Sequence, residues 1–336
     1  MTGRIACFGE LLLRLSAPGR ELLLQGARLE VHVGGAEANV AVGLARLGHQ
    51  AAMISRVPDN ALGDAAAGHL RRYGVATDGV VTGPGRMGLY FLSPGAGLRA
   101  SSIVYDREGS AFALAGAGDY DWDRLFDGAD MLHLSGITPA LGDGPAEAAL
   151  AAAAAARAKG IPVSFDGNYR ESLWQRRQGE PAPVLKRLVA EADILFGNHR
   201  DISLLLGRHF DGDGPGRRRE AAEAAFEEFP RLGTIASTTR HVEDSERHRI
   251  AARIDGRDGA DQTEEMLVAG IVDRIGAGDA FAAGVLHGIR LGREREWCVH
   301  SGLALACLKH GLPGDASLFG PAEVEAFMAG ERDVRR

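Results

Sequence analysis

The residues with the clearest chemical meaning are two glycines and an aspartate that open a helix predicted over residues 277–290. Residues 273–279 read DRIGAGD. Glycines allow consecutive backbone N–H groups to turn toward one point, and the helix dipole adds partial positive charge at that point. An anion is therefore expected there, and the Asp279 carboxylate beside it is suited to take a proton from an attacking hydroxyl group.

A second pair of glycines precedes another predicted helix, over residues 37–47, near the other end of the chain. Residues 33–41 read VGGAEANVA. The glycines allow a ligand to come close to the backbone, and the Asn39 side chain offers both a donor and an acceptor to hydroxyl groups. Because glycine pairs before helices are common, this pattern gains its meaning from the first segment.

Together the two segments resemble motifs of the ribokinase-like sugar kinases, also called the PfkB carbohydrate kinase family. The first motif of that family is G-G-x-x-x-N-x-A, and the late motif is D-T-x-G-A-G-D-x-F, in which Arg274 takes the place of the usual threonine. The resemblance implies that Asp279 is the general base in phosphoryl transfer from ATP to a sugar. It also implies that the N–H groups around the transferred phosphoryl belong to Gly276, Ala277 and Gly278, and that the sugar contacts Gly34, Gly35, Asn39 and Asp279.

Two further segments resemble the 2-keto-3-deoxygluconate kinases within this family. Residues 105–107 read YDR, similar to a Y-x-R segment of their lid, and residues 165–174 read FDGNYRESLW, similar to F-D-x-N-Y-R-x-x-L-W. A sugar acid presents a carboxylate, which the guanidinium groups of Arg107 and Arg170 can hold through charge-assisted bonds. Tyr90 and Tyr105 are expected to contact the rest of the sugar acid.

The predicted reaction is ATP-dependent phosphorylation of 2-keto-3-deoxygluconate at its terminal hydroxyl, giving 2-keto-3-deoxy-6-phosphogluconate. Two alternatives stay open: a kinase of another sugar, such as fructose, ribose or a related sugar acid, and a sensor that binds a sugar acid without transferring phosphate. The sensor alternative is suggested by the part of the chain that is expected to bind the nucleotide. Many family members carry a G-x-x-G turn after the strand that corresponds to residues 232–237, whereas this chain has no glycine from there to Gly256.

The expected cofactors are ATP and Mg²⁺. Residues 198–201 read NHRD and resemble the N-x-x-E motif that orders water around Mg²⁺, with aspartate in place of glutamate. Asn198 and Asp201 are therefore expected to act on the metal through water, and the segment around 306–314 is expected to border the adenine. The residues expected to bind the nucleotide are Asn168, Asn198, Thr238, Arg240, Gly276, Gly278 and His310.

The elements that must position these residues alternate between short apolar runs and longer helical patterns, which is typical of a parallel sheet covered by helices. With the resemblance, this predicts one ribokinase-like α/β domain over residues 1–336, with three layers and a mostly parallel central sheet. Strands are predicted at 5–8, 51–57, 131–135, 162–166, 194–197 and 232–237, and helices at 37–47, 61–73, 146–159, 184–191, 220–229, 277–290 and 297–308.

Two segments, at about 11–33 and 87–112, interrupt this alternation with strand-like patches and no helix between them. We expect them to form a small β-sheet lid; the alternative is that they are edge strands of the main sheet. Because lid strands with exposed edges can pair between subunits, and the family resemblance implies such a dimer, a homodimer through the lid is expected. The charged stretch 211–219 is expected to be a loop before a helix.

The composition is that of a soluble globular protein, and the partners that the resemblance implies are a small-molecule sugar acid and ATP. The 336 residues carry 38 Lys and Arg against 45 Asp and Glu, a net charge of −7, which disfavours a nucleic-acid partner. No apolar run reaches the roughly 18 residues of a membrane span, and no signal peptide is predicted, so a cytoplasmic location is expected. The three cysteines show no metal-binding spacing.

Overall fold

The structure, a computed structural model, describes residues 3–331. Its central sheet has ten strands in the order β13-β12-β11-β10-β9-β8-β1-β4-β5, with β14 paired to β12. Neighbouring strands from β5 to β11 are parallel, and β12 is antiparallel to its three partners. The strands are β1 Arg4–Phe8, β4 Ala51–Pro58, β5 Ala76–Gly83, β8 Ala129–Ser135, β9 Val163–Asp166, β10 Ile194–Phe196, β11 Thr234–Asp244, β12 Arg247–Gly256, β13 Gly259–Gln262 and β14 Met266–Ala269.

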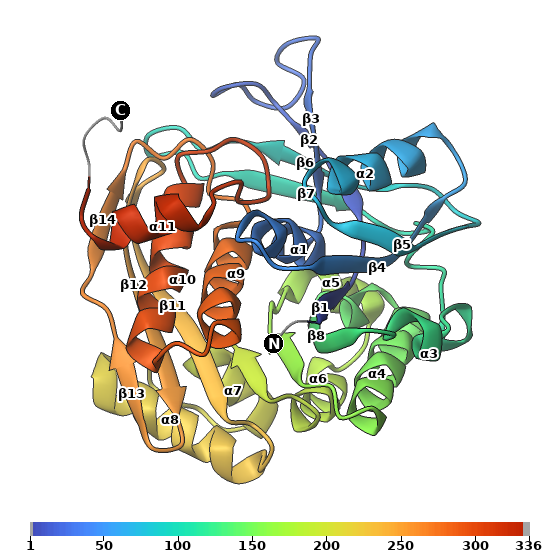
Figure 1. Ribbon diagram of the computed structural model, residues 1–336. Helices are drawn as coiled ribbons and strands as arrows, with labels where there is room; N and C mark the ends of the chain where they lie inside the picture. Colours follow the sequence, from blue (N-terminus) through green and yellow to red (C-terminus); the bar gives the residue numbers. More distant parts are fainter. Residues whose placement is uncertain (1–2, 332–336) are drawn as a thin grey trace.

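Helices cover both faces of this sheet (Figure 1). One face carries α1 Ala36–Arg46, α2 Ala61–Arg72, α9 Ala277–Arg290, α10 Arg295–Lys309 and α11 Pro321–Met328. The other carries α3 Trp122–Leu125, α4 Asp143–Ala158, α5 Glu171–Arg177, α6 Pro181–Ala190, α7 His199–Leu206 and α8 Gly214–Glu228. Two short 3₁₀ helices span Ala117–Asp119 and Pro139–Leu141. The predicted three-layer fold with a mostly parallel sheet is confirmed.

The central strand β1 shows how the sequence produces the layers. Its residues Ile5 to Phe8 are fully buried, because both faces of the sheet are covered. Alternate side chains point to opposite faces, so Ile5 and Cys7 belong to one core while Ala6 and Phe8 belong to the other.

Helices α1 and α9 approach each other closely through small residues. A Cβ added at Gly43 would lie 2.9 Å from the Cβ of Ala283, so the glycine leaves room for the neighbouring helix. This contact lets two helices that lie far apart in the sequence pack side by side.

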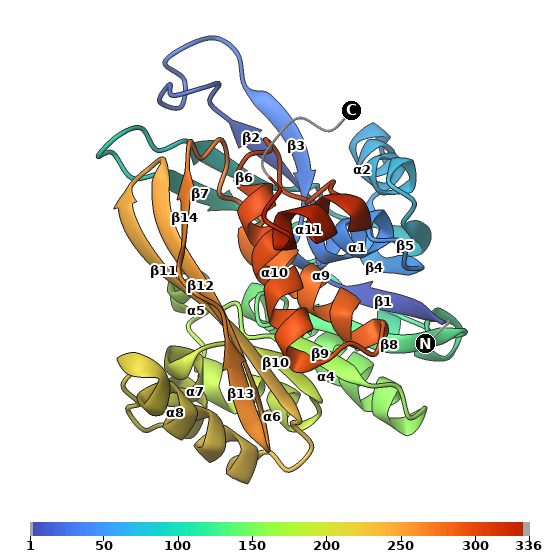
Figure 2. The ribbon, with the colours of Figure 1, turned by 60° about the vertical axis from the view of Figure 1, so that its left-hand side comes forward.

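The lid is a separate four-stranded sheet in the order β3-β2-β6-β7, with β2 Leu12–Ser16, β3 Glu30–Gly34, β6 Gly88–Ser93 and β7 Ser102–Asp106. Figure 2 shows these strands above the ends of the main sheet. The predicted second, small sheet is therefore confirmed, and the alternative of edge strands in the main sheet is wrong.

Several predicted bounds were wrong. Strand β11 does not end at 237 but runs to Asp244, because it pairs along its length with β12. The stretch 211–219 is a loop only to Asp213; helix α8 starts at Gly214, with a proline in its first turn, where the missing N–H costs nothing. The sequence patterns also missed β5, β12–β14, α3, α5, α7 and α11.

Candidate active site

The N-terminal end of α9 has free backbone donors that face open space. Gly276 precedes the helix with φ 78°, and no side chain caps the helix. Within residues 3–331, the N–H groups of Gly278 and Asp279 have no acceptor. A Cβ at Gly278 would meet no atom within 4 Å. This end of the helix can therefore receive an anion. The N–H group of Ala277, expected to face the transferred phosphoryl, instead donates to the carbonyl oxygen of Arg274 at 3.3 Å.

Asp279, in the first turn of α9, receives a hydrogen bond from the opposite end of the chain. The Asn39 side chain, on α1, donates from Nδ2 to Oδ2 of Asp279 at 2.6 Å. Burial raises the pKa of Asp279 to about 7, although this hydrogen bond acts in the opposite direction. A carboxyl group with a pKa near neutrality is suited to accept a proton.

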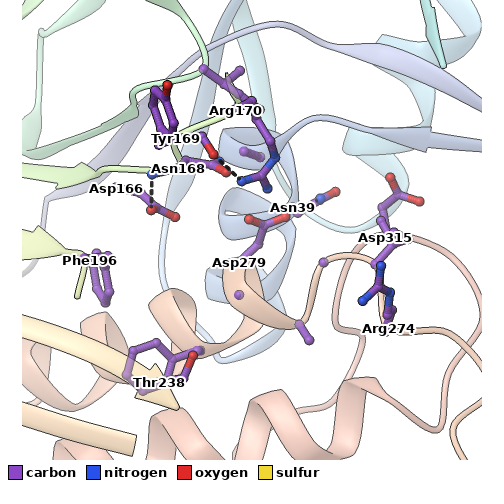
Figure 3. Close-up of a pocket in the computed structure, with 18 of the residues that line it drawn as sticks. Asn39, Asp166, Asn168, Tyr169, Arg170, Phe196, Thr238, Arg274, Asp279 and Asp315 are labelled. Carbon is purple, nitrogen blue, oxygen red and sulfur yellow. Dashed lines mark hydrogen bonds between the residues drawn. The ribbon is translucent and has the colours of Figure 1, made fainter. Parts of the chain in front are cut away.

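A cavity of about 700 Å³, here called the lid-side cavity, surrounds Asp279 (Figure 3). Of the predicted site residues it is lined by Gly35, Asn39, Tyr90, Tyr105, Arg107, Asn168, Arg170, Asn198, Asp201, Thr238, Arg240, Gly276, Ala277, Gly278 and Asp279. Residues that lie on the lid, on both helical layers and at the ends of the parallel strands therefore meet in one place.

Two of the predicted residues have other surroundings. Gly34 does not line the cavity; a Cβ there would lie 2.2 Å from Oδ2 of Asp315, so the glycine makes room for that carboxylate. His310 lines a second cavity and is buried, and its Nδ1 donates to the carbonyl oxygen of Ala306 at 2.7 Å. Burial lowers the pKa of His310 to about 4, so the ring is neutral at pH 7.

The two predicted arginines of the carboxylate clamp differ in their surroundings. Arg107 is buried and paired through Nε with Glu10, which also accepts a hydrogen bond from Ser110. Arg170 is exposed and has no carboxylate partner within residues 3–331; its Nη1 donates to the carbonyl oxygen of Tyr169 at 3.1 Å. Figure 3 shows Arg170 extending toward Asp279. Glu10 thus fixes one guanidinium, and the other is free to meet an anion.

A buried ionic network, missed by the sequence patterns, connects the lid to the loop before α9. Arg14, on β2, lies 2.6 Å from Oδ2 of Asp273 and 3.1 Å from Oδ1 of Asp315. The hydroxyl of Tyr90, on β6, donates to Oδ2 of Asp315 at 2.5 Å. The buried Lys309 ammonium donates to the carbonyl oxygen of Asp273 at 3.3 Å. These contacts hold the loop in place relative to the lid strands.

Asp166 is a second carboxyl group of the site that the sequence patterns did not single out. It ends strand β9, and its Oδ1 accepts a hydrogen bond from the backbone N–H of Asn168 at 3.0 Å. Burial, with the nearby charges of Asp279 and Asp201, raises the pKa of Asp166 to about 8. Its position at the carboxyl end of a parallel strand was the available signal, because ligands bind along that edge.

The second cavity, of about 880 Å³ and here called the α7-side cavity, lies between α7, α8, β11 and the end of α10. It shares part of its lining with the lid-side cavity, including Asn198, Thr238, Arg240, Ala277 and Gly278. The two cavities therefore meet at the N-terminal end of α9.

Asn198 and Asp201 form the cap of α7. The Asn198 side chain accepts from the N–H of Arg200, and Oδ2 of Asp201 accepts from the N–H of Asn198, both at 2.8 Å. No group of three or more His, Cys, Asp or Glu side chains that could hold a metal exists within residues 3–331. The residues therefore fit Mg²⁺ only in its usual form, in which water and substrate phosphates supply most ligands.

None of the helices within residues 3–331 combines the length and apolar character that a membrane span requires.

Comparison with known proteins gives consistent relatives. Residues 2–318 match the model of the pfkB family carbohydrate kinases. The chain is 32% identical over 331 residues to 2-dehydro-3-deoxygalactonokinase of Haloferax volcanii, covering 98% of each chain. It is 28% identical over 335 residues to 2-dehydro-3-deoxygluconokinase of Thermoproteus tenax, covering 96% of this chain and 94% of the relative.

A solved structure agrees. The crystal structure of 2-dehydro-3-deoxygluconokinase of Thermotoga maritima has a TM-score of 0.93 and 36% identity, and the match covers 98% of this chain and 100% of the other. The family match spans nearly the whole chain. The chain therefore belongs to the pfkB family of carbohydrate kinases and is a phosphotransferase.

Proposed function

We propose that this kinase transfers the γ-phosphoryl group of ATP to the terminal hydroxyl of 2-keto-3-deoxygluconate, giving 2-keto-3-deoxy-6-phosphogluconate and ADP. The observation that carries the choice of a sugar acid is the presence of two arginines, Arg107 and Arg170, in the cavity that contains Asp279. Glu10 already neutralises Arg107, but a neutral sugar would leave Arg170 without an anion, whereas a carboxylate can bind Arg170 and the terminal nitrogens of Arg107. Two similar proteins are named 2-dehydro-3-deoxygluconokinase, and these names support the same choice.

The substrate would lie under the lid, with Tyr90 and Tyr105 beside its carbon chain. These two rings come from adjacent lid strands, and their centroids are 6.1 Å apart. The Glu10 carboxylate fixes Arg107 through Nε, so its terminal nitrogens are left for the sugar carboxylate. Asn39 and the backbone at Gly35 supply further contacts to the sugar hydroxyls.

Asp279 acts as the general base. Its carboxylate takes the proton of the terminal hydroxyl while the hydroxyl oxygen forms a bond to the γ-phosphorus and the bond from that phosphorus to the β-phosphate oxygen breaks. The free N–H groups of Gly278 and Asp279 stabilise the negative charge on the transferred group. The lid excludes water that would otherwise accept the phosphoryl group.

ATP would occupy the α7-side cavity, with its phosphates directed to the end of α9 and with Asn168, Asn198, Thr238 and Arg240 around them. Bound Mg²⁺ supplies positive charge to the phosphate oxygens. Asn198 and Asp201 would hold water molecules of its coordination sphere. His310, neutral and buried, would form part of the wall near the adenine.

A second candidate substrate is 2-keto-3-deoxygalactonate, which differs from the first in configuration at one carbon. It is favoured by the Haloferax volcanii relative, whose name gives the galactonate substrate. Both acids present the same carboxylate to the arginines.

The intact contact of Asn39 with Asp279 argues for an active kinase rather than a sensor.

The test is an assay of ADP release with a panel of 2-keto-3-deoxygluconate, 2-keto-3-deoxygalactonate, fructose and ribose. The proposal expects kcat/KM for the gluconate acid to exceed that for neutral sugars by at least tenfold. Higher kcat/KM for fructose or ribose would contradict it, and a clear preference for the galactonate acid would replace the substrate by its epimer.

The lid also supports the proposal of a homodimer. Its strands β3 and β7 form the two edges of the small sheet, and they carry exposed Val31 and Val104. Exposed β-edges with apolar side chains pair readily with another chain. Sedimentation of wild type and of the Val31→Lys variant would test this, with a monomer expected for the variant.

We also propose a cytoplasmic location, since ATP is required.

A further inference from the structure

The junction of the two cavities lies beside two arginines that have no carboxylate partner. Arg240, on β11, lines both cavities, and Arg274, on the loop before α9, lines the lid-side cavity. Within residues 3–331 neither guanidinium forms an ion pair or a hydrogen bond, whereas Arg14 on the neighbouring lid strand has two carboxylate partners.

The two guanidinium groups act on each other electrostatically. Arg240 is exposed and Arg274 is half-buried. Partial burial of the Arg240 guanidinium and the neighbouring charge of Arg274 lower the pKa of Arg240. Burial and both charges lower the pKa of His248, on β12, while Asp244 acts against them. Like charges held together without a carboxylate are unfavourable, so this pair is expected to be satisfied by an anion that arrives from solution.

The backbone of β11 offers little to such an anion. From Thr234 to Asp244 it is paired with β12, and Thr238 faces Ala252 while Arg240 faces Ile250 in the ladder. The turn at residues 245–246 has no free N–H groups, because Ser245 donates to the carbonyl oxygen of Gly97 at 2.9 Å and Glu246 donates to Oδ1 of Asp244 at 2.8 Å. Positive charge on the β11 side of the two cavities must therefore come from side chains.

We infer that Arg274 and Arg240 form a phosphate clamp, in which Arg274 contacts the transferred γ-phosphoryl group of ATP. This inference rests on the proposed phosphoryl transfer and adds Arg274 to its catalytic residues.

The role in the reaction follows from charge. As the bond between the γ-phosphorus and the β-phosphate oxygen breaks and the sugar oxygen binds, charge spreads over the three outer oxygens of the transferred group, and the proton passes to Asp279. A planar guanidinium with several donors stabilises this distribution better than a hydroxyl or an ammonium group. Figure 3 shows that Arg274 and Asp279 belong to the same short segment, so the position of this segment determines where both side chains lie.

The kinetic test compares Arg274→Met, Arg274→Lys and Arg274→Thr with wild type. The clamp predicts that Arg274→Met lowers kcat by ~10²–10³, the scale for loss of one group that stabilises transition-state charge. It predicts partial recovery in Arg274→Lys, and an unchanged KM for the sugar. Arg293→Met is the matched control, because exposed Arg293 lines a cavity formed by other residues. A raised KM for the sugar with an unchanged kcat would assign Arg274 to the substrate carboxylate and overturn the clamp.

A second readout does not depend on activity. Removing one of two repelling charges is expected to raise the Tm of Arg274→Met and of Arg240→Met in the absence of nucleotide. Saturating ATP is expected to raise the Tm of these variants by less than it raises the Tm of wild type. Calorimetric titration with ATP, in the absence of sugar, is expected to show at least tenfold weaker binding to the double variant. An ATP-induced shift equal to that of wild type in both single variants would overturn the clamp.

The binding experiment also separates failure of the clamp from failure of the proposed function. Wild type that binds ATP through Arg240 and Arg274 yet phosphorylates no 2-keto-3-deoxy acid would overturn the substrate proposal and support the clamp. Wild type that phosphorylates the acid, with ATP binding and kcat unaffected in the variants, would support the substrate proposal and overturn the clamp.

Discussion

Nδ2 of Asn39 lies 2.6 Å from Oδ2 of Asp279, although 240 residues separate them in the chain. The hydrogen bond joins the first turn of α9 to α1, so each glycine-led helix contributes one member of a functional pair. It also favours the charged form of Asp279 against the effect of burial. The protonation state of Asp279 therefore depends on its hydrogen bond with Asn39.

Replacement of Asp279 by Asn is expected to reduce kcat by ~10² or more, because no group remains to accept the hydroxyl proton. The change is nearly isosteric, so the KM for ATP should stay close to wild type, and the Tm should not fall. Steady-state kinetics with the sugar acid would measure this. A variant with wild-type kcat would contradict the role of Asp279 as the base.

The pH dependence of kcat/KM for the sugar is expected to have an acidic limb near pH 7 in the free enzyme. The pKa of Asp279 is raised to about 7, so the base is protonated below that pH and activity rises as pH increases through it. In Asn39→Ala, loss of the donated hydrogen bond should raise this pKa and move the limb to higher pH. A limb that stays in place would show that Asn39 does not stabilise the carboxylate.

The thermal stability of the ligand-free protein is expected to fall as pH rises from about 5 to 8. The pKa values of Asp166 and Asp279 are raised to about 8 and about 7, so the folded state binds more protons than the unfolded state in this range. Asp166→Asn should therefore raise the Tm at pH 8 by roughly 1–2 °C, the shift that about 1 kcal/mol causes in a protein of this length. The difference should shrink as the pH falls toward 3.8, the ordinary pKa of the group, because the carboxyl group then becomes protonated in the unfolded state as well.

The two arginines of the proposed clamp for the sugar carboxylate can be tested separately. Arg107→Met and Arg170→Met should each raise the KM for the sugar acid by about 10–100-fold, since one hydrogen bond to a charged group contributes about 1.5–3 kcal/mol. Because Glu10 would be left buried without its partner, Arg107→Met should also lower the Tm. Arg170 is exposed, so its variant should keep the wild-type Tm. Equal KM values in wild type and Arg170→Met would remove Arg170 from the substrate site.

Gly276 and Gly278 form a matched pair for separating packing from ligand contact. A Cβ at residue 276 would lie 1.6 Å from the carbonyl oxygen of Asp315, and the backbone there has φ 78°, so Gly276→Ala should destabilise the fold. A Cβ at residue 278 would meet no atom within 4 Å. Gly278→Ala should therefore keep the wild-type Tm while lowering kcat, because its methyl group enters the space proposed for phosphate. Similar losses of Tm in both variants would contradict this distinction.

Much of the parallel core could be predicted because its strands are apolar on both faces, as in Ile5–Phe8. The hairpin β11–β12 could not be predicted as readily, because the polar and charged residues after 237 give no period that separates strand from loop. The glycine motifs singled out Asn39 and Asp279, and both residues line one cavity. The pairing of Arg14 with Asp273 gave no local signal, because a buried ion pair depends on how distant segments meet.

The close packing of Gly43 against Ala283 has a consequence for the order in which function arises during synthesis. Chains fold from the N-terminal part as they leave the ribosome, so the lid strands and Asn39 are present well before α9 has been made. The proton acceptor enters the cavity only when α9 packs against α1. An unfinished chain can therefore contain the sugar-facing residues without being able to consume ATP, and catalytic competence coincides with completion of the last core layer.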